Sequence, residues 1–146
     1  MGKNTQCVGR YISMLYRASN CYINKELCKY GIGSGQYIFL LYVFNNNGCN
    51  QEEISTVLNI DKGTTARALQ KLEKEGYINK EIDKNDRRIN HIIITKKGSE
   101  IKNIIIKILN SWEKMLYSDF TEKEKKELLK LLEKASLNCH NYKAKQ

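Results

Sequence analysis

The order of secondary-structure signals over residues 50–98 constrains the fold of this chain more than any other feature. Apolar periodicity predicts a short helix over 51–58 and, after a tight turn, a second helix over 62–75. Two runs rich in β-branched residues, 77–82 and 91–95, then predict a pair of strands around a polar loop. Helix, turn, helix and hairpin in this order are typical of a winged helix-turn-helix, so we predict a mainly α fold with a small β-hairpin.

Capping signals set the boundaries of these elements. Asn50 with Glu53 three residues on has the pattern of a capping box, Asp61 is a candidate N-cap, and Gly76 is a candidate C-terminal stop. The positions expected to face the core are Ile54, Val57, Leu58, Ala66, Leu69 and Leu72.

Longer helices are expected on both sides of this segment. We predict one over residues 5–29 and an almost wholly apolar one over 36–45, capped by Ser34 and buried at the centre. Another is predicted over 97–117, and a last one opens at a second capping box, Thr121 with Glu124.

The first helix and the last two helices each carry an apolar stripe that the winged helix-turn-helix does not need for its own core. We therefore predict a single domain over 1–146, with a DNA-binding lobe at 36–98 and N- and C-terminal dimerisation helices at 1–30 and 99–146. Packing of the stripes within one chain is the alternative to pairing with a second copy.

Composition excludes several classes of protein. Five cysteines form no CxxC pair, and the N-terminus has no apolar leader, which favours a cytoplasmic protein with free thiols. No run is long enough to span a membrane, so no membrane partner is expected. The two histidines, His91 and His140, lack metal-ligand spacing, and we find no nucleophile, phosphate-loop or paired-carboxylate motif. We therefore predict no metal, no cofactor and no enzymatic activity.

The helix over 62–75 has the residue types that a major groove requires. Short hydroxyls allow close approach of the backbone, and basic side chains reach guanine edges or phosphates. The predicted DNA contacts on this helix are Lys62, Thr64, Thr65, Arg67, Gln70 and Lys71, placed with Ala68 opposite or beside the core-facing side. An ordinary solvated face is the alternative. The net charge of +9 adds little, because it is spread along the chain.

The loop over 83–90 supplies the second half of the predicted interface. Arginines at a hairpin tip can enter a narrow minor groove, where the negative potential is strongest. Asp86 lies two residues before Arg88 and can hold its guanidinium in a fixed pose. The predicted contacts here are Lys84, Asp86, Arg87 and Arg88. A charged loop with an incidental ion pair is the alternative.

The stretches QEEISTVLNIDKGTTARALQKLEKEGYI, DKNDRR and ITKKG resemble the MarR (multiple antibiotic resistance regulator) family of bacterial transcription factors, over about residues 36–100. Asp86 and Arg88 match the family's aspartate-x-arginine wing. The resemblance implies an obligate homodimer that binds double-stranded DNA at a pseudo-palindromic operator. It also implies a repressor that a small phenolic ligand or thiol oxidation releases, although some members activate transcription.

Two kinds of effector signal are compatible with the sequence, a small ligand and an oxidant. By resemblance, a small aromatic effector would bind between the dimer helices and the DNA-binding lobe, against Tyr11, Tyr16, Arg17, Tyr37 and Phe44. The alternative is that these aromatic side chains belong to the hydrophobic core. A peroxide-sensing branch of the family uses a cysteine near the start of the first helix. The matching position in this chain lies two residues from Cys7, which makes Cys7 the candidate redox sensor. The alternative is that Cys7 acts only as a small hydrophobic residue.

Two other functions fit the same residues. The chain could be a winged-helix protein-interaction module without specific DNA binding, because a fold does not fix a function. It could also be a nonspecific, nucleoid-type DNA binder. Binding to the gene's own upstream region distinguishes all three.

Overall fold

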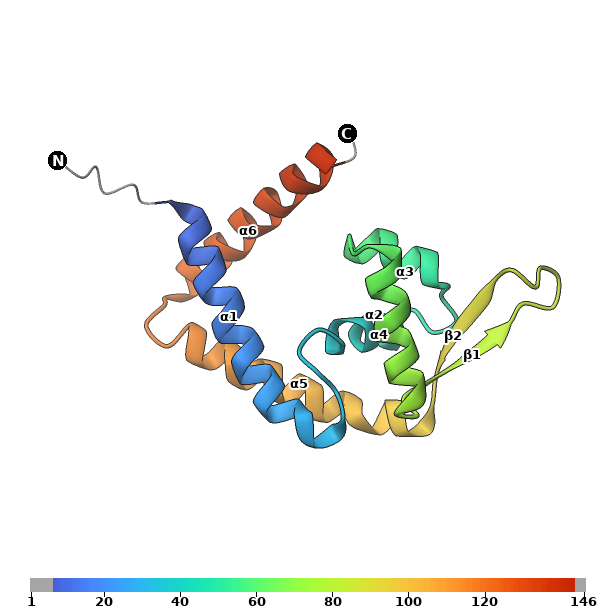
Figure 1. Ribbon diagram of the computed structural model, residues 1–146. Helices are drawn as coiled ribbons and strands as arrows, with labels where there is room; N and C mark the ends of the chain where they lie inside the picture. The colour runs from blue at the N-terminus through green and yellow to red at the C-terminus, as the bar shows by residue number, and fades with distance from the viewer. Residues whose placement is uncertain (1–6, 144–146) are drawn as a thin grey trace. The chain divides into compact units, whose positions relative to one another are not determined.

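The predicted fold class is confirmed. The computed structural model describes residues 7–143, which form six α-helices, a 3-10 turn and one two-stranded antiparallel hairpin (Figure 1). In chain order the elements are α1 (Val8–Leu27), η1 (Cys28–Tyr30), α2 (Tyr37–Asn45), α3 (Gln51–Leu58), α4 (Lys62–Lys74), β1 (Ile78–Ile82), β2 (Asn90–Ile94), α5 (Lys96–Leu116) and α6 (Glu122–Lys143).

The chain divides into two compact units, Met1–Trp112 and Glu113–Gln146, and the boundary falls inside α5. The first unit holds the hydrophobic core. Its fully buried side chains come from the end of α1, from α2, α3 and α4, from the hairpin and from the first half of α5. As predicted, α2 lies centrally, because Phe39, Leu40 and Val43 are all buried.

Two inward-facing positions were predicted wrongly. On α4 the buried residues are Thr65, Ala68, Leu69 and Leu72, which follow the i, i+3, i+4, i+7 spacing of one helix face. Ala66 lies beside that face and is only half-buried. On α3 the buried side runs through Ile54 and Ser55, and Val57 is 63% exposed.

The helix before the winged unit also starts differently from the prediction. Ser34 does not cap α2. The N-cap is Gln36, which makes no capping bond with its side chain and instead accepts the Gly33 N–H at 2.7 Å. The first helix was predicted over residues 5–29, whereas α1 ends at Leu27 and passes into the η1 turn. Residues 5 and 6 of the predicted helix lie outside the described part of the chain.

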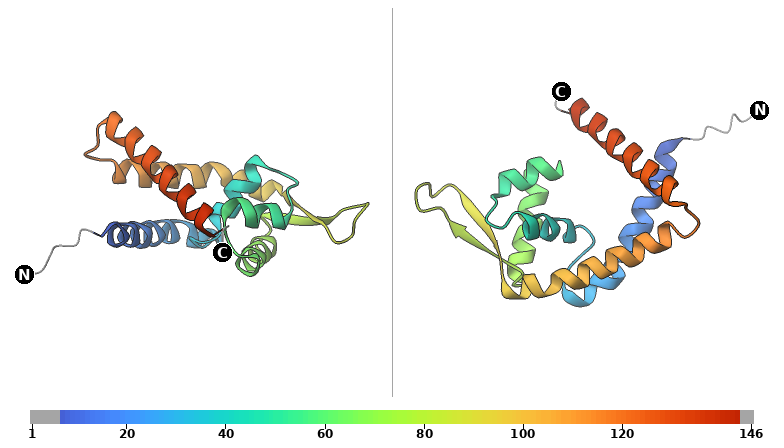
Figure 2. Two further views of the ribbon diagram at one scale, coloured as in Figure 1. Left: turned by 90° about the horizontal axis from the view of Figure 1, so that it is seen from above. Right: turned by 180° about the vertical axis from the view of Figure 1, so that it is seen from behind.

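The hairpin pairs Ile78 with Ile94 at its base and Ile82 with Asn90 near its loop. The loop between them reaches out beyond the helices of the first unit, as the views in Figure 1 and Figure 2 both show. The other edge of β2 is covered by residues 47–50. There Gly48 N–H donates to the Ile92 carbonyl at 2.8 Å, and Ile92 N–H donates to the Cys49 carbonyl at 2.8 Å.

The junction from β2 into α5 is a close approach of backbone. Thr95 caps the start of α5 by accepting the Gly98 N–H at 3.0 Å, and its hydroxyl donates to the Gly76 carbonyl at 2.7 Å. A Cβ at Gly98 would overlap the Tyr77 carbonyl oxygen and would lie 2.5 Å from Ile94 Cδ1. Only glycine fits at this position without a shift of the backbone.

The terminal helices expose their apolar side chains. On α1, Val8, Tyr11, Ile12 and Leu15 are between 45% and 71% exposed. In the second unit, α6 opens at the predicted Thr121–Glu124 capping box, and four of its five leucines are exposed: Leu129, Leu131, Leu132 and Leu137. None of the helices in the described residues combines the length and the apolar character that crossing a membrane requires.

Candidate nucleic-acid interface

The turn between α3 and α4 is fixed by local hydrogen bonds. At the start of α3 the predicted capping box is complete, because Glu53 N–H donates to Asn50 Oδ1 and Asn50 N–H donates to Glu53 Oε2, both at 2.9 Å. Asn59 then takes a left-handed conformation with φ of 52°. The Ser55 hydroxyl donates to the Ile60 carbonyl at 2.6 Å and closes the turn.

The first turns of α4 present a basic and hydroxyl-bearing surface. Asp61 caps the helix as predicted and accepts the Thr64 N–H at 2.8 Å. Arg67 Nη2 donates to Thr64 Oγ1 at 3.1 Å, so these two side chains lie together at the start of the helix. The predicted contacts Lys62, Arg67, Gln70 and Lys71 are exposed, and Thr64 is half-exposed.

Thr65 does not belong to this surface. Its side chain is fully buried on the core side of α4, with an exposed fraction of 0%, and Ala68 beside it is 7% exposed. The sequence prediction placed both on the DNA side because it put Ala66, and not Thr65, on the buried face with Leu69 and Leu72. A side chain in the core cannot meet a base edge, so Thr65 makes no side-chain contact from this surface.

The hairpin loop holds Arg88 in a defined pose. Asp86 Oδ1 accepts both the backbone N–H and the Nε–H of Arg88 at 3.0 Å, and Asp86 Oδ2 accepts from Nη2 at 2.9 Å. These bonds lower the pKa of the Asp86 carboxyl. The Arg88 side chain remains 89% exposed, against 35% for Asp86, so the carboxylate orients a guanidinium that still faces outward. Lys84 and Arg87 are exposed on the same loop.

A third group of contacts, at the base of the loop, was not predicted from the sequence. His91 on β2 lies between the Gly48 carbonyl, 2.8 Å from its Nδ1, and Asp83 Oδ2, 2.8 Å from its Nε2. The hydrogen bond from His91 and those from the Asp86 and Asn85 N–H groups lower the pKa of Asp83 to about 2. The pKa of His91 is raised, first by Asp83 and then by Gly48. No sequence signal marks this contact, because Gly48 and His91 are 43 positions apart.

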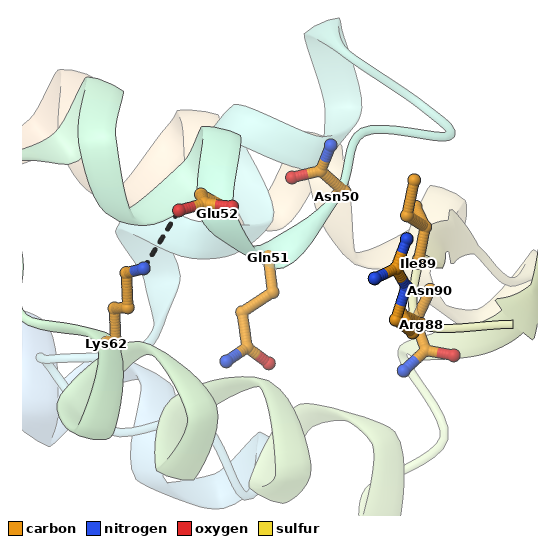
Figure 3. A pocket seen from close by; sticks show the side chains of 7 residues that line it. All are labelled: Asn50, Gln51, Glu52, Lys62, Arg88, Ile89 and Asn90. Atoms are coloured by element: carbon orange, nitrogen blue, oxygen red, sulfur yellow. Dashed lines mark hydrogen bonds and ion pairs between the residues drawn. The ribbon is translucent and has the colours of Figure 1, made fainter. Parts of the chain in front are cut away.

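A cleft of about 370 Å³ lies between the start of α3, the start of α4 and the hairpin loop (Figure 3). Its lining residues are Asn50, Gln51, Glu52, Lys62, Arg88, Ile89 and Asn90. Lys62 Nζ lies 2.8 Å from Glu52 Oε1 across it, and both side chains are about three-quarters exposed. The cleft therefore has Lys62 of α4, paired with the Glu52 carboxylate, on one side and Arg88 of the loop on the other.

The five predicted effector residues divide between two helices. Tyr11, Tyr16 and Arg17 are exposed on α1, and Tyr37 and Phe44 are partly buried on α2. Burial raises the pKa of Tyr37, and the electrostatic influence of Tyr16 raises it further. Phe44 lies under the Lys102 ammonium, 5.5 Å from its ring centre. None of the five lines the cleft described above.

The cysteines are all free thiols in this structure. Cys7 is exposed at the N-cap of α1, and Cys21, Cys28 and Cys139 are also exposed. Cys49 is buried beside the hairpin, and this burial raises the pKa of its thiol. Among residues 7–143, no group of three or more His, Cys, Asp or Glu side chains is placed to hold a metal ion.

Fold and surface together define a winged helix-turn-helix protein. The model of the MarR family matches residues 34–89. Over 121 residues the chain is 34% identical to the HTH-type transcriptional regulator BilQ of Clostridioides difficile (strain CD3), covering 83% of this chain and 82% of that protein. The chain therefore belongs to the MarR family.

Solved structures agree with this assignment. A MarR transcriptional regulator from Methanosarcina mazei Go1 has a TM-score of 0.86 and 41% identity, over 92% of this chain and 97% of that one. A MarR-family transcriptional regulator from Listeria monocytogenes, complexed with 26mer DNA, has a TM-score of 0.87 and 30% identity, over 94% and 91% of the two chains. The family and the relatives are transcriptional regulators, which confirms the prediction that the chain is not an enzyme.

Proposed function

We propose that this regulator binds a pseudo-palindromic DNA operator as a homodimer, represses transcription there, and is released by a small aromatic ligand or by oxidation of a thiol. This proposal rests mainly on the Arg88 guanidinium, which Asp86 holds facing outward on the loop that follows the capped and basic helix α4. In this arrangement α4 enters the major groove through Lys62, Thr64, Arg67, Gln70 and Lys71, and Arg88 enters the adjacent minor groove.

The direct test is binding to a labelled duplex that covers the gene's own upstream region. We expect a specific complex whose affinity falls linearly with salt on a log–log plot, with a slope of about −0.9 for each phosphate neutralised. Arg88→Ala should weaken this complex strongly. Lys134→Ala on α6 removes the same charge from outside the winged unit and serves as the matched control.

The outcomes separate the alternatives. Equal loss in Arg88→Ala and Lys134→Ala, or equal binding to unrelated duplexes, would point to nonspecific charge attraction. Absence of any complex at low salt, with a stable protein partner instead, would favour a protein-interaction module.

Homodimerisation is supported by the apolar side chains that α1 and α6 expose. A protein of this size rarely leaves so many large apolar residues in water unless they meet a partner. Sedimentation should give twice the mass of one chain. Leu15→Lys on α1, where Leu15 is 45% exposed, should shift the mass toward a single chain. A dimer that is unaffected by this change would remove α1 from the proposed interface.

Release is tested with two reagents. If the Tyr11, Tyr16, Arg17, Tyr37 and Phe44 group binds an effector, a phenolic carboxylate should dissociate the DNA complex, and Arg17→Ala should abolish the response. If Cys7 is the sensor, peroxide should dissociate the complex and Cys7→Ser should resist it. Cys139→Ser is the control, because Cys139 is another exposed thiol.

A further inference from the structure

The His91 ring bridges two parts of the molecule through both of its nitrogens. Each nitrogen faces an oxygen that can only accept a hydrogen bond, the Gly48 carbonyl for Nδ1 and the Asp83 carboxylate for Nε2. A neutral imidazole has one donor and one acceptor nitrogen, so it can satisfy only one of these two contacts. Both hydrogen bonds exist together only when the ring is doubly protonated and positively charged.

Asp83 passes this contact on to the tip of the loop. Its Oδ2 accepts a hydrogen bond from the His91 Nε2–H, and its Oδ1 accepts the backbone N–H groups of Asn85 at 2.7 Å and Asp86 at 2.9 Å. Asp86 in turn holds the Arg88 guanidinium through both of its carboxylate oxygens. A continuous series of polar contacts therefore runs from the Gly48 carbonyl, through His91, to the guanidinium that faces outward.

The anchor at the other end of the series belongs to the scaffold. Gly48 N–H donates to Ile92 at 2.8 Å, and Asn47 Oδ1 accepts the Ile94 N–H at 2.8 Å, so residues 47–50 are bound along β2. Cys49 is buried, and Ile92 belongs to the core. The Gly48 carbonyl is thus a fixed point against which the loop can be positioned.

The charged and titratable groups around His91 favour its cationic form. Asp83 is the closest, Glu53 at the start of α3 also raises the pKa of His91, and Glu81 lies opposite His91 on β1. Cys49, on the covering segment, has a raised pKa, so its thiol is neutral.

We propose that His91 is a positioning residue for DNA binding: its doubly protonated ring fixes Asp83 against residues 47–50 and thereby sets where Arg88 points. Loss of the ring proton breaks one of the two hydrogen bonds and frees the loop from the scaffold. DNA affinity therefore falls as the pH rises through the pKa of His91. This inference rests on the proposed DNA binding through the wing.

The first test is DNA affinity against pH at constant ionic strength, with a fluorescent duplex of the gene's upstream region. The pH should run from about 6 to about 8.5, to bracket a pKa raised above the ordinary histidine value of about 6.5. We expect the wild-type affinity to fall about tenfold, the order of one hydrogen bond to a charged group. In His91→Gln both N–H donors lie on one nitrogen, which can take the place of only one ring nitrogen, and the amide does not titrate, so the variant should bind weakly with a flat profile.

His140→Gln is the matched control, because His140 is the only other histidine of the chain and lies on exposed α6. It should keep the wild-type profile. A His91→Gln protein with the pH dependence of the wild type would overturn the proposal. A His140→Gln protein that loses the dependence would overturn it as well.

A second test does not need DNA. In an NMR titration of the free protein, the Asn85 and Asp86 amides and the Arg88 Nε–H should shift with the same midpoint as the His91 ring. Asp83→Asn should lower that midpoint. Independence of the Arg88 signal from His91 would refute the positioning role, even if the protein binds DNA. If the wild type binds no duplex but these shifts coincide, the proposed function fails and the coupling within the loop stands.

Discussion

Replacing Thr65 by valine should stabilise the protein without changing its affinity for DNA. Thr65 Oγ1 is fully buried on α4 and has no hydrogen-bond partner among the described residues. A buried hydroxyl without a partner costs about 1–3 kcal/mol, whereas a methyl group of the same shape carries no such cost. Thr and Val have nearly the same helix propensity, so the backbone contributes little.

We therefore expect Thr65→Val to raise the free energy of unfolding by about 1 kcal/mol, which corresponds to a rise in Tm of about 4 °C for a chain of this size. Thermal unfolding followed by circular dichroism measures the stability, and the labelled upstream duplex measures the affinity. The affinity should stay at the wild-type value, because the side chain lies on the core side of α4.

The neighbouring threonine provides the control. Thr64 is half-exposed and accepts a hydrogen bond from Arg67 at 3.1 Å, so Thr64→Val should weaken DNA binding and should bring no gain in stability. A lower Tm for Thr65→Val would show that its hydroxyl is satisfied in solution. A loss of DNA affinity in Thr65→Val would show that the face of α4 toward the DNA has been placed incorrectly.

Three further changes test other parts of the structure. Gly98→Ala should lower the free energy of unfolding by about 1–3 kcal/mol in denaturant titration, because the new Cβ overpacks against Tyr77 and Ile94. Gly9→Ala is its control, where the Cβ would lie 3.6 Å from Cys7 Sγ, and equal effects would refute the close approach. Glu52→Gln should raise DNA affinity severalfold at low salt, because it frees Lys62 and removes a negative charge from the cleft, and unchanged affinity would place the cleft away from the DNA. The stability of the wild type relative to Asp83→Asn should be greatest between about pH 4 and about pH 6.5, and this difference should fade as the pH falls through about 2, the pKa of folded Asp83. The same difference in the free energy of unfolding should also fade as the pH rises through the raised pKa of His91. A difference that stays constant with pH in denaturant titrations would contradict the Asp83–His91 pair.

Local hydrogen bonds explain which parts of the interface could be predicted from the sequence. The capping box at Asn50, the cap at Asp61 and the pair Asp86–Arg88 each join residues two or three positions apart. Such contacts depend on residue type and spacing, which a sequence displays directly. The order of the elements was predictable for the same reason.

The orientation of each helix about its own axis was less predictable. On α4 the alanine at 66 and the threonine at 65 are both small, so hydrophobicity alone favoured burying the alanine. Tertiary packing instead buries Thr65, because the face formed with Leu69 and Leu72 runs through position 65. On α3 the polar Ser55 is buried because its hydroxyl closes the turn at Ile60. A helix of only two turns with few apolar residues leaves this choice open.

The attachment of the wing to the scaffold was not predictable at all, and the reason is physical. An exposed strand edge can be satisfied by any segment that offers donors and acceptors in register. Here residues 47–50 fill that role for β2, with Asn47 bonded to Ile94 and Gly48 bonded to His91 across more than forty positions of sequence. The geometry of the loop is therefore encoded locally, whereas its direction relative to α4 is set by these distant contacts. In the proposed mode of DNA binding α4 and Arg88 meet two grooves at once, so residues that touch no nucleotide would still control the affinity.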